Sequence, residues 1–425
     1  MKQNSIFTKI EEDSQKNWIS FSFVISSLVV QIISLTFGAE LFWMTDWKTF
    51  LLAVVLGDLI LSVFLCISGY IGYSMRIPTA AQYGNIFGRI GAKIMNIVLL
   101  PAGIIWVAWM SDIAASTVHD VFPVIPGWTV VLVIVALSVF SAIRGVKGME
   151  QSGYIQAPIV LILVLIGVIS ICIKGFGNGS IVLQTNQGTH VSLLEGVTFV
   201  VLTWISLLPI FSDYTRYVRT PKDMGIATFL SYGLLYTVML IAGGVFAMAC
   251  GPEYSLVRAF GAAGIPQWLV LVVVLLCTWT FNDRSFYSFG IAAGIIVGEK
   301  VKEWIPLVLG GLLAAGIALC GIVDQIYPVL NFIGSIFAPL FGIYLCRYYL
   351  LGGIKNCTSN FSGMIRFDWL PFVPWAVGSS LGLLLQKGQT AISFAVGFIL
   401  YYIMFQCRKA IQIKKTSGGN QSCMD

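Results

Sequence analysis

Three tryptophans and two amide side chains lie within long apolar stretches of this 425-residue sequence. Trp106 and Trp109 are three residues apart, and Trp204 lies in a separate stretch, LTWISLLPIFSDYTR. The face of an aromatic side chain can stack on a flat conjugated ligand, a contact worth about 1–3 kcal/mol for a nucleic-acid base. The amides of Gln31 and Asn282 each carry a donor and an acceptor, which match the edge of a pyrimidine, purine or hydantoin. These residues indicate a site for a planar nitrogen heterocycle, with ordinary core packing of the tryptophans as the alternative.

Asp112 continues the spacing of the two neighbouring tryptophans, so that Trp106, Trp109 and Asp112 form one stripe on a helix. A charged aspartate in a membrane helix costs about 2.5–3.5 kcal/mol on insertion scales when it faces lipid. We therefore expect Asp112 to face the protein interior or to be protonated. A functional acid and a neutral, hydrogen-bonded structural acid both fit this expectation.

Four charged side chains follow apolar runs in two stretches. Asp213 and Arg216 end the run that contains Trp204, and Asp283 and Arg284 follow the run LVVVLLCTWTFN. Asp283 and Arg284 are adjacent, so they point to different faces of a helix and do not simply pair with each other. Because both sets fall in the same half of the membrane, we expect one of this pair to meet Asp213 or Arg216. Such a contact would be an inner gate or a permanent structural clamp.

The composition places these residues in a membrane protein. Hydrophobic residues make up 57% of the chain and charged residues 10%, and the mean hydropathy is +0.88, whereas soluble domains average about 25% charged residues. A spanning helix needs roughly 20 apolar residues. Twelve such stretches occur, at about 18–38, 50–72, 94–118, 128–146, 155–174, 196–218, 226–250, 266–294, 304–323, 327–350, 368–386 and 389–407. We expect an all-α polytopic bundle of twelve transmembrane helices without a soluble domain.

The distribution of Lys and Arg predicts the orientation of this bundle. With the N-terminus inside, twenty of the 25 Lys and Arg residues fall in inner segments, four fall in outer segments, and Arg284 lies within a span. This bias follows the positive-inside rule and predicts cytoplasmic tails at residues 1–17 and 408–425 of a plasma-membrane protein. Topology thereby accounts for the net charge of +6, which does not indicate nucleic-acid binding.

Cysteine and histidine show no metal-binding spacing. The nine Cys residues are scattered, mostly within spans, and His119 and His190 lie in outer segments. An intramembrane enzyme would need catalytic histidines or paired acidic motifs at a membrane face, so the sequence argues against an enzyme. We expect no cofactor, no metal beyond a coupling ion, and no obligate protein partner besides the surrounding lipid.

Two of the twelve stretches carry features that interrupt a helix. The first, FVISSLVVQIISLTFGAEL, places Ser27, Gln31 and Ser34 on one face, and such residues either bond neighbouring helices or line a site. The sixth contains Pro209, which removes the backbone donor to the Ile205 carbonyl, so this helix is either kinked or broken.

These two stretches are five spans apart. Interrupted helices at corresponding positions of two halves indicate the binding site of a transporter. The matching scaffold has a core at 18–350, made of two five-helix repeats of inverted topology at about 18–174 and 196–350, followed by two accessory helices at 368–407. We therefore expect a secondary transporter.

Three motifs resemble those of the nucleobase–cation symporter family, which includes permeases for cytosine and for hydantoins. They are WTFND, SDYTRYVRTPKD and LNFIGSIFAPLFGIYLCRYYL, and the similarity covers nearly the whole chain. The resemblance implies a leucine-transporter-like fold and uptake of a planar nitrogen heterocycle with Na⁺ or H⁺. It also implies that Trp109 and Trp204 face the two sides of the ligand, that Asn282 contacts its polar edge, and that Gln31 matches a first-span glutamine.

For the coupling cation, the resemblance implies a site on the first and eighth spans. Thr280 matches a hydroxyl position and Cys277 a backbone-carbonyl position, and Ser27 and Val30 match positions on the first span. The sequence departs from the family pattern at Phe281, where a second hydroxyl is expected. This loss weakens the case for Na⁺.

Two further departures concern the ligand. Trp106 stands where cytosine-transporting relatives carry Gln, which argues against cytosine itself. Asp112 is an acid that the family pattern does not predict, and it would act as a proton-coupling group or contact an amine of the ligand. We expect import of a nucleobase or a related heterocycle. The alternatives are the same fold carrying allantoin or hydantoin, a thiamine-precursor pyrimidine or an amino acid, and a substrate-sensing receptor.

Overall fold

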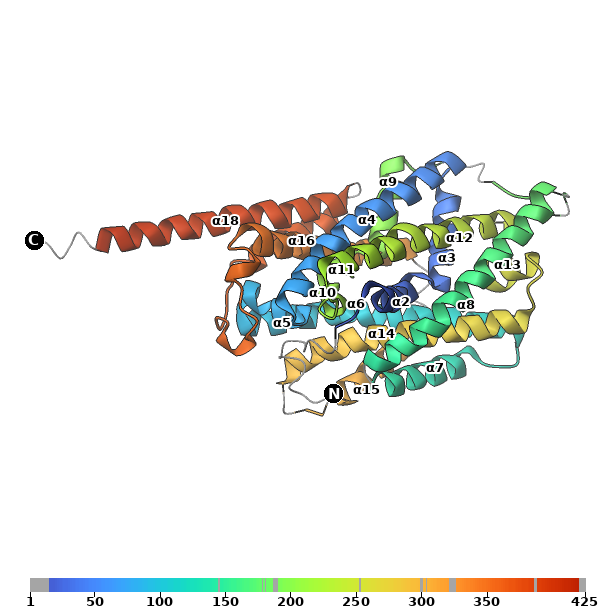
Figure 1. Ribbon diagram of the computed structural model, residues 1–425, viewed down its shortest axis with the longest axis horizontal. Coiled ribbons are helices and arrows are strands. Elements are labelled where there is room, and N and C mark those ends of the chain that lie inside the picture. The colour runs from blue at the N-terminus through green and yellow to red at the C-terminus, as the bar shows by residue number, and fades with distance from the viewer. Residues whose placement is uncertain are drawn as a thin grey trace, which may run out of the picture.

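The computed structural model describes residues 15–143, 146–177, 179, 181–185, 190–251, 254–298, 301–302, 304–320, 326–385 and 388–419. The two tails predicted at 1–17 and 408–425 lie partly outside these residues. Helices dominate the described chain and form an elongated bundle, and α18 (Gln389–Gly419) projects beyond the bundle at one end (Figure 1).

The remaining helices follow one another with short connections. In the first half they are α2 (Trp18–Val29), α3 (Ile32–Met44), α4 (Trp47–Met75), α5 (Thr79–Gln82), α6 (Gly84–Val121), α7 (Gly127–Ala142) and α8 (Val146–Cys172). In the second half they are α9 (Leu193–Thr203), α10 (Ser212–Thr215), α11 (Pro221–Thr228), α12 (Tyr236–Cys250), α13 (Leu256–Ala262), α14 (Gln267–Val297), α15 (Trp304–Leu319), α16 (Ile326–Leu345) and α17 (Phe372–Leu384).

The helices match the predicted membrane spans. Within the described residues, eight helical segments are long and apolar enough to cross a membrane, and the bent pair α2–α3 makes a ninth. Three shorter apolar helices, α7, α15 and α17, lie at the other three predicted stretches. Each predicted stretch thus overlaps a helix, and the predicted all-α membrane fold is confirmed.

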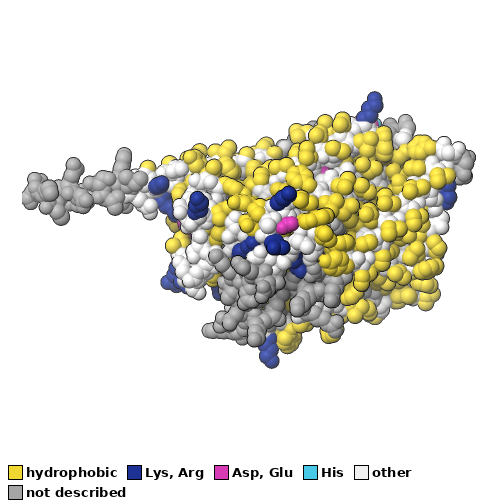
Figure 2. Space-filling view, viewed as in Figure 1, with side chains coloured by type: hydrophobic (Ala, Val, Ile, Leu, Met, Phe, Trp, Pro, Cys, Tyr) yellow, Lys and Arg dark blue, Asp and Glu magenta, His cyan; other side chains and the backbone are white. Residues whose placement is uncertain are grey.

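The outer surface of the bundle is apolar, as lipid contact requires. Leu52, Val55 and Leu59 are exposed on α4, and Ile155 and Ile162 are exposed on α8. Figure 2 shows that hydrophobic side chains cover most of one face, with few charged side chains among them.

Both predicted interruptions are present in the structure. The first span breaks between Val29 and Ile32, and its two halves are bent by 52°. The sixth span breaks at Trp204, where α9 ends with φ −124° and ψ 14°. Pro209 lies within the short 3₁₀ turn that follows, so the helix has already ended before it reaches the proline.

Side chains from neighbouring helices satisfy carbonyl groups at these breaks, since unpaired backbone groups are costly inside a membrane. Gln156 Nε2 on α8 donates to Val30 O at 2.5 Å. Ser68 Oγ on α4 donates to Leu208 O at 2.5 Å. These hydrogen bonds therefore stabilise the non-helical backbone at both breaks.

Glycines bring α3 and α12 into backbone contact. A Cβ at Gly243 would overlap Leu35 O, and a Cβ at Gly38 would overlap Leu240 O. Contacts through small residues are typical of helix pairs in membranes. This pair fixes the second half of the broken first span against α12.

Gly243→Ala is expected to lower the melting temperature of the detergent-purified protein. The added methyl group overlaps the Leu35 carbonyl, and overpacking costs about 1–3 kcal/mol. Gly316→Ala on α15 is the control, because no atom lies within 4 Å of its added Cβ. Thermal unfolding followed by intrinsic fluorescence should separate the two variants, and an unchanged melting temperature for Gly243→Ala would speak against the close contact.

Candidate functional site

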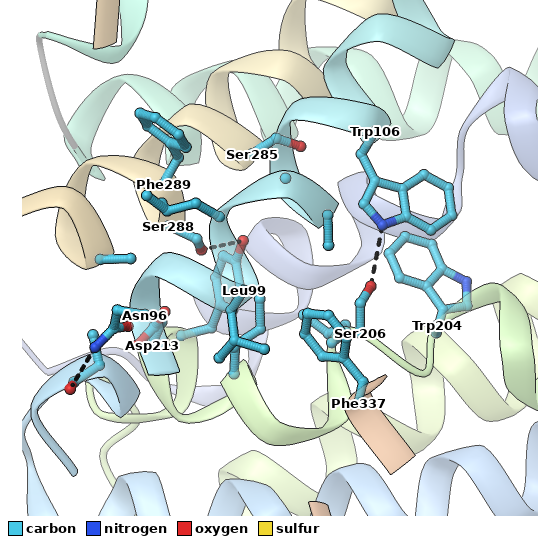
Figure 3. Close-up of a pocket in the computed structure, with 18 of the residues that line it drawn as sticks. Asn96, Leu99, Trp106, Trp204, Ser206, Asp213, Ser285, Ser288, Phe289 and Phe337 are labelled. Carbon is cyan, nitrogen blue, oxygen red and sulfur yellow. Dashed lines mark hydrogen bonds between the residues drawn. The ribbon is translucent and has the colours of Figure 1, made fainter. Parts of the chain in front are cut away.

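A cavity opens beside the break of the sixth span. Trp106, Trp204 and Ser206 lie at one side of it, and Asn96 and Asp213 lie at the other (Figure 3). The full lining consists of Leu28, Ala80, Tyr83, Asn96, Leu99, Leu100, Ala102, Gly103, Trp106, Trp204, Ser206, Leu207, Ile210, Asp213, Tyr214, Phe281, Ser285, Ser288, Phe289, Ala292 and Phe337.

The cavity extends toward the side of the bundle that the sequence predicts to be cytoplasmic. Asn96 and Leu99 come from the first part of α6, and Ser288 and Ala292 come from the last part of α14. The walls are mainly apolar, with hydroxyls, one amide and one carboxyl among them. Concave apolar sites with a few polar groups are typical of small-ligand binding.

Trp106 stacks against both of the other predicted tryptophans. Its ring centroid lies 5.6 Å from that of Trp109, with 18° between the planes, and 6.3 Å from that of Trp204, with 15° between the planes. Its Nε1 donates to Ser206 Oγ at 3.1 Å (Figure 3). The stacking surface that the resemblance assigns to a ligand is therefore covered, in this conformation, by the protein's own indole.

The side chains of the two predicted amides, Gln31 and Asn282, are fully buried. In each, the amide nitrogen donates a hydrogen bond while the amide oxygen accepts none from a described residue. Asn282 Nδ2 donates to Ser111 Oγ at 3.1 Å, and Gln31 Nε2 donates to Ser27 O at 2.6 Å. Among the residues that the structure describes, Asn282 Oδ1 and Gln31 Oε1 are buried without a hydrogen-bond partner. Leaving such an atom unpaired costs about 1–3 kcal/mol, and neither amide is among the residues that line the cavity.

The residues predicted for the cation meet where α2 faces α14, and their backbone oxygens already accept hydrogen bonds. Val30 O accepts from Gln156 Nε2, and Thr280 O accepts from Arg284 Nη1, each at 2.5 Å. Cys277 O accepts from Thr280 Oγ1 at 3.0 Å. Hard cations bind through oxygen atoms, and these oxygens are engaged by N–H and O–H donors.

A fixed positive charge stands beside the same residues. Arg284 is 0% exposed. The point where a Cβ at Gly153 would lie is 3.2 Å from Arg284 Nη2 and also 3.2 Å from Ser27 Oγ, which places the guanidinium near the remaining predicted residue. Two like unit charges 4 Å apart repel by about 4 kcal/mol at an effective dielectric constant of 20. The residues at this junction therefore do not fit a bound Na⁺.

Two of the four residues predicted as an inner gate make bonds between separate elements. Asp213 Oδ1 accepts from Thr79 N, at the start of α5, at 2.7 Å. Arg216 Nη2 donates to Tyr287 OH on α14 at 2.8 Å. The sixth and eighth spans are thus linked through Arg216 and Tyr287. The prediction instead named Asp283 or Arg284 as the partner on the eighth span, and Asp283 is buried on α14.

Asp112 is half-buried on α6 and is not among the residues that line the cavity. A second acid, Asp58 on α4, is only 1% exposed and accepts from Thr237 Oγ1 at 2.6 Å. Sequence reasoning missed Asp58, although an acid inside a predicted span is the signal that marks such a residue. Its partner lies 179 residues further along the chain, which no local pattern reveals.

Sequence reasoning also missed two residues that complete the cavity wall beside the tryptophans. Ser206 holds the Trp106 indole, and it lies within the segment where the sixth span unwinds. Phe281 lies 6.1 Å from Trp106 and 6.4 Å from Trp204 between ring centroids. The position where the family pattern predicts a cation-binding hydroxyl therefore adds a third aromatic side chain to the cavity wall, beside Trp106 and Trp204.

Two solved structures share this fold. Mhp1, a nucleobase-cation-symport-1 family transporter in a closed conformation with bromovinylhydantoin bound, is 12% identical, with a TM-score of 0.80 over 94% of both chains. A Na⁺-coupled sialic acid symporter is also 12% identical, with a TM-score of 0.72 over 96% of this chain and 93% of the other. These likenesses confirm the predicted inverted-repeat transporter fold.

The similarity of sequence extends along most of the chain. The cytosine permease of Escherichia coli (strain K12) is 22% identical over 411 residues, which cover 95% of each protein. The allantoin permease of Bacillus subtilis (strain 168) is 21% identical over 419 residues, with 85% of this chain and 83% of the permease covered. The family described as permeases for cytosine/purines, uracil, thiamine and allantoin matches residues 9–404. The resemblance seen in the motifs is thereby confirmed, and the chain belongs to this family of multi-pass membrane permeases.

Proposed function

We propose that this permease imports a planar nitrogen heterocycle, either a nucleobase such as cytosine or a relative such as allantoin, across the cell membrane together with a cation. The observation that carries the proposal is the aromatic wall of Trp106, Trp204 and Phe281 on a cavity at a broken span. Transporters of this architecture hold their substrates at such breaks. The cytosine and allantoin permeases among the relatives support the same substrate class.

In the substrate complex, the heterocycle stacks on Trp109 and Trp204 after Trp106 has left its stacked position. Ring N–H groups then donate to Asn282 Oδ1 and Gln31 Oε1, the two buried oxygens without partners. The bond from Asn282 to Ser111, two residues beyond Trp109 on α6, supports this placement. Asp112, one residue further on, is the acid available for an exocyclic amine or for a proton.

Alternating access would come from movement of one helix group against the other around the two breaks. The cavity reaches Asp213, three residues before Arg216, which bonds Tyr287, and we assign this side and both chain termini to the cytoplasm. Asp213, Arg216, Asp283 and Arg284 lie on this side of the breaks as the inner-gate region. Loss of the contact between Arg216 and Tyr287 would let α10 and α14 separate and widen the exit.

Coupling to a cation gives the transporter its driving force. Import of one positive charge contributes about 2.3 kcal/mol per 100 mV of membrane potential. This energy corresponds to a concentration ratio of roughly 50 for the substrate.

Uptake by proteoliposomes tests the proposal. Radiolabelled cytosine, uracil, hypoxanthine and allantoin are offered separately, with protein-free liposomes as the control, under an inward cation gradient and an inside-negative potential. At least one heterocycle should accumulate, and excess unlabelled heterocycle should compete. Accumulation of amino acids alone would refute the substrate class, and binding without accumulation would identify a receptor in place of a transporter.

A further inference from the structure

Two nitrogen-bearing side chains converge on the junction of α2 and α14. Gln156, on α8, donates to Val30 O and lies 3.6 Å from Cys277 Sγ. Arg284, one helical turn after Thr280, donates to Thr280 O. Both side chains are 0% exposed, so they reach these oxygens within the core of the bundle.

Several other oxygens of the junction are also engaged, whereas the amide oxygens of Gln31 and Gln156 are buried without a hydrogen-bond partner among the described residues. Ser27 O accepts from Gln31 Nε2 at 2.6 Å, and Cys277 O accepts from Thr280 Oγ1 at 3.0 Å. Ser27 Oγ in turn donates to Val24 O at 2.8 Å. A metal cation needs several oxygen ligands at once, so it would have to compete with these donors for the same oxygens.

The guanidinium also lies close to the elements that a bound cation would hold together. The site of an added Cβ at Gly153, on α8, lies 2.7 Å from Phe23 O on α2 and 3.2 Å from Arg284 Nη2 on α14. An arginine side chain stays protonated and presents five donors in one plane. Its charge and donors are a permanent part of the chain, whereas a bound ion would come and go.

We propose that Arg284, together with Gln156, takes the place of a coupling Na⁺ at the junction of α2 and α14, so that this permease works without Na⁺. The consequence for transport rests on the permease function proposed above, while ion binding can be measured without a substrate. The residue at position 281 supports the same proposal, because a phenylalanine stands where the family pattern predicts a hydroxyl at this junction.

Binding of radioactive sodium to the purified full-length protein tests the proposal. We expect no saturable binding, and we expect the same melting temperature in NaCl and in KCl of equal ionic strength, because a ligand that binds the folded state raises the melting temperature. Saturable binding, or a higher melting temperature in NaCl, would overturn the proposal.

Removing the guanidinium should create a response to Na⁺. In Arg284→Ala, Thr280 O and the volume of the side chain become available, so NaCl should raise the melting temperature of this variant above its value in KCl. Arg284→Lys retains a charge and should show no difference between the salts. Arg216→Ala is the matched control, since it removes another buried guanidinium, one that bonds Tyr287, and it should also show no difference.

A folded Arg284→Ala protein with the same melting temperature in NaCl and in KCl would also count against the assignment. If this variant does not fold, sodium binding to the wild type decides. In proteoliposomes, replacing external Na⁺ by K⁺ should leave the initial rate of heterocycle uptake unchanged, and a fall to the protein-free level would contradict the proposal. If no heterocycle is transported, the proposed function fails, and the sodium-binding result still stands by itself.

Discussion

Trp204→Ala is expected to weaken binding of the heterocycle by roughly 5- to 150-fold, the equivalent of the 1–3 kcal/mol that one base–aromatic stack contributes. The Trp204 ring lines the cavity at the helix break and is held edge-on by Tyr232 and Tyr236, with centroids 5.6 and 6.0 Å away. Uptake at low substrate concentration should fall by the same factor, because the ring acts by binding the substrate.

Trp268→Ala is the matched control for this variant. Trp268 lies at the start of α14 and is 65% exposed, so its loss should change neither binding nor uptake. Equilibrium binding of labelled substrate to the purified variants measures both effects. Wild-type affinity in a folded Trp204→Ala protein would remove the central residue of the proposed site.

Trp106→Gln is expected to act in the opposite direction and to raise substrate affinity by about 10-fold. An aromatic pair contributes about 0.5–1.5 kcal/mol beyond burial, and Trp106 forms two such pairs as well as a hydrogen bond to Ser206. Since a substrate must displace this ring before it stacks, the apparent affinity of the wild type is reduced by the small fraction of open molecules.

Ser206→Ala provides a graded comparison, because it removes only the hydrogen bond that holds the Trp106 indole. Its effect on affinity should have the same sign as that of Trp106→Gln and a smaller size. Isothermal titration of the wild type and both variants with one heterocycle measures the series. A loss of affinity in Trp106→Gln would mean that the substrate stacks on Trp106 itself.

The two helix breaks could be predicted from the sequence because their causes are local. Hydropathy marks each span, and the polar first span and Pro209 mark the interruptions within two of them. The sequence does not predict the exact position of the second break, because α9 ends at Thr203, several residues before the proline. Packing against α4 and the bond from Ser68 to Leu208 stabilise the unwound segment, and these contacts join residues far apart in the chain.

The arrangement within the site could be predicted only in part. Spacing placed Trp106 and Trp109 on one stripe, but the stacking of Trp106 on Trp204 joins α6 to the break after α9. Gln156 gave no signal, since a single amide in an apolar span is equally consistent with a helix–helix bond. Arg284 was recognised as a buried charge, yet its direction toward Thr280 depends on the packing of α14 against its neighbours.

The departure from the family pattern at Phe281 and the buried charge of Arg284 have related consequences in the structure. At position 281 the family pattern predicts a cation-binding hydroxyl, whereas Phe281 forms part of the aromatic wall of the cavity. Arg284 supplies the neighbouring junction with a charge of its own. In our proposal, the shared fold thus keeps its broken spans and its aromatic site, while the chemistry of the cation site changes.

Photocrosslinking with 4-thiouracil, a nucleobase analogue, tests the central claim most directly. The analogue is irradiated with the purified full-length permease, and the modified peptides are identified by mass spectrometry, with and without excess unlabelled transported substrate. We predict adducts on the segments around Trp106 and Trp204 that disappear in the presence of the competitor. Competitor-sensitive adducts confined to another hollow, such as the surface pocket lined by Arg347 and Asp368, would contradict a substrate site at the tryptophans.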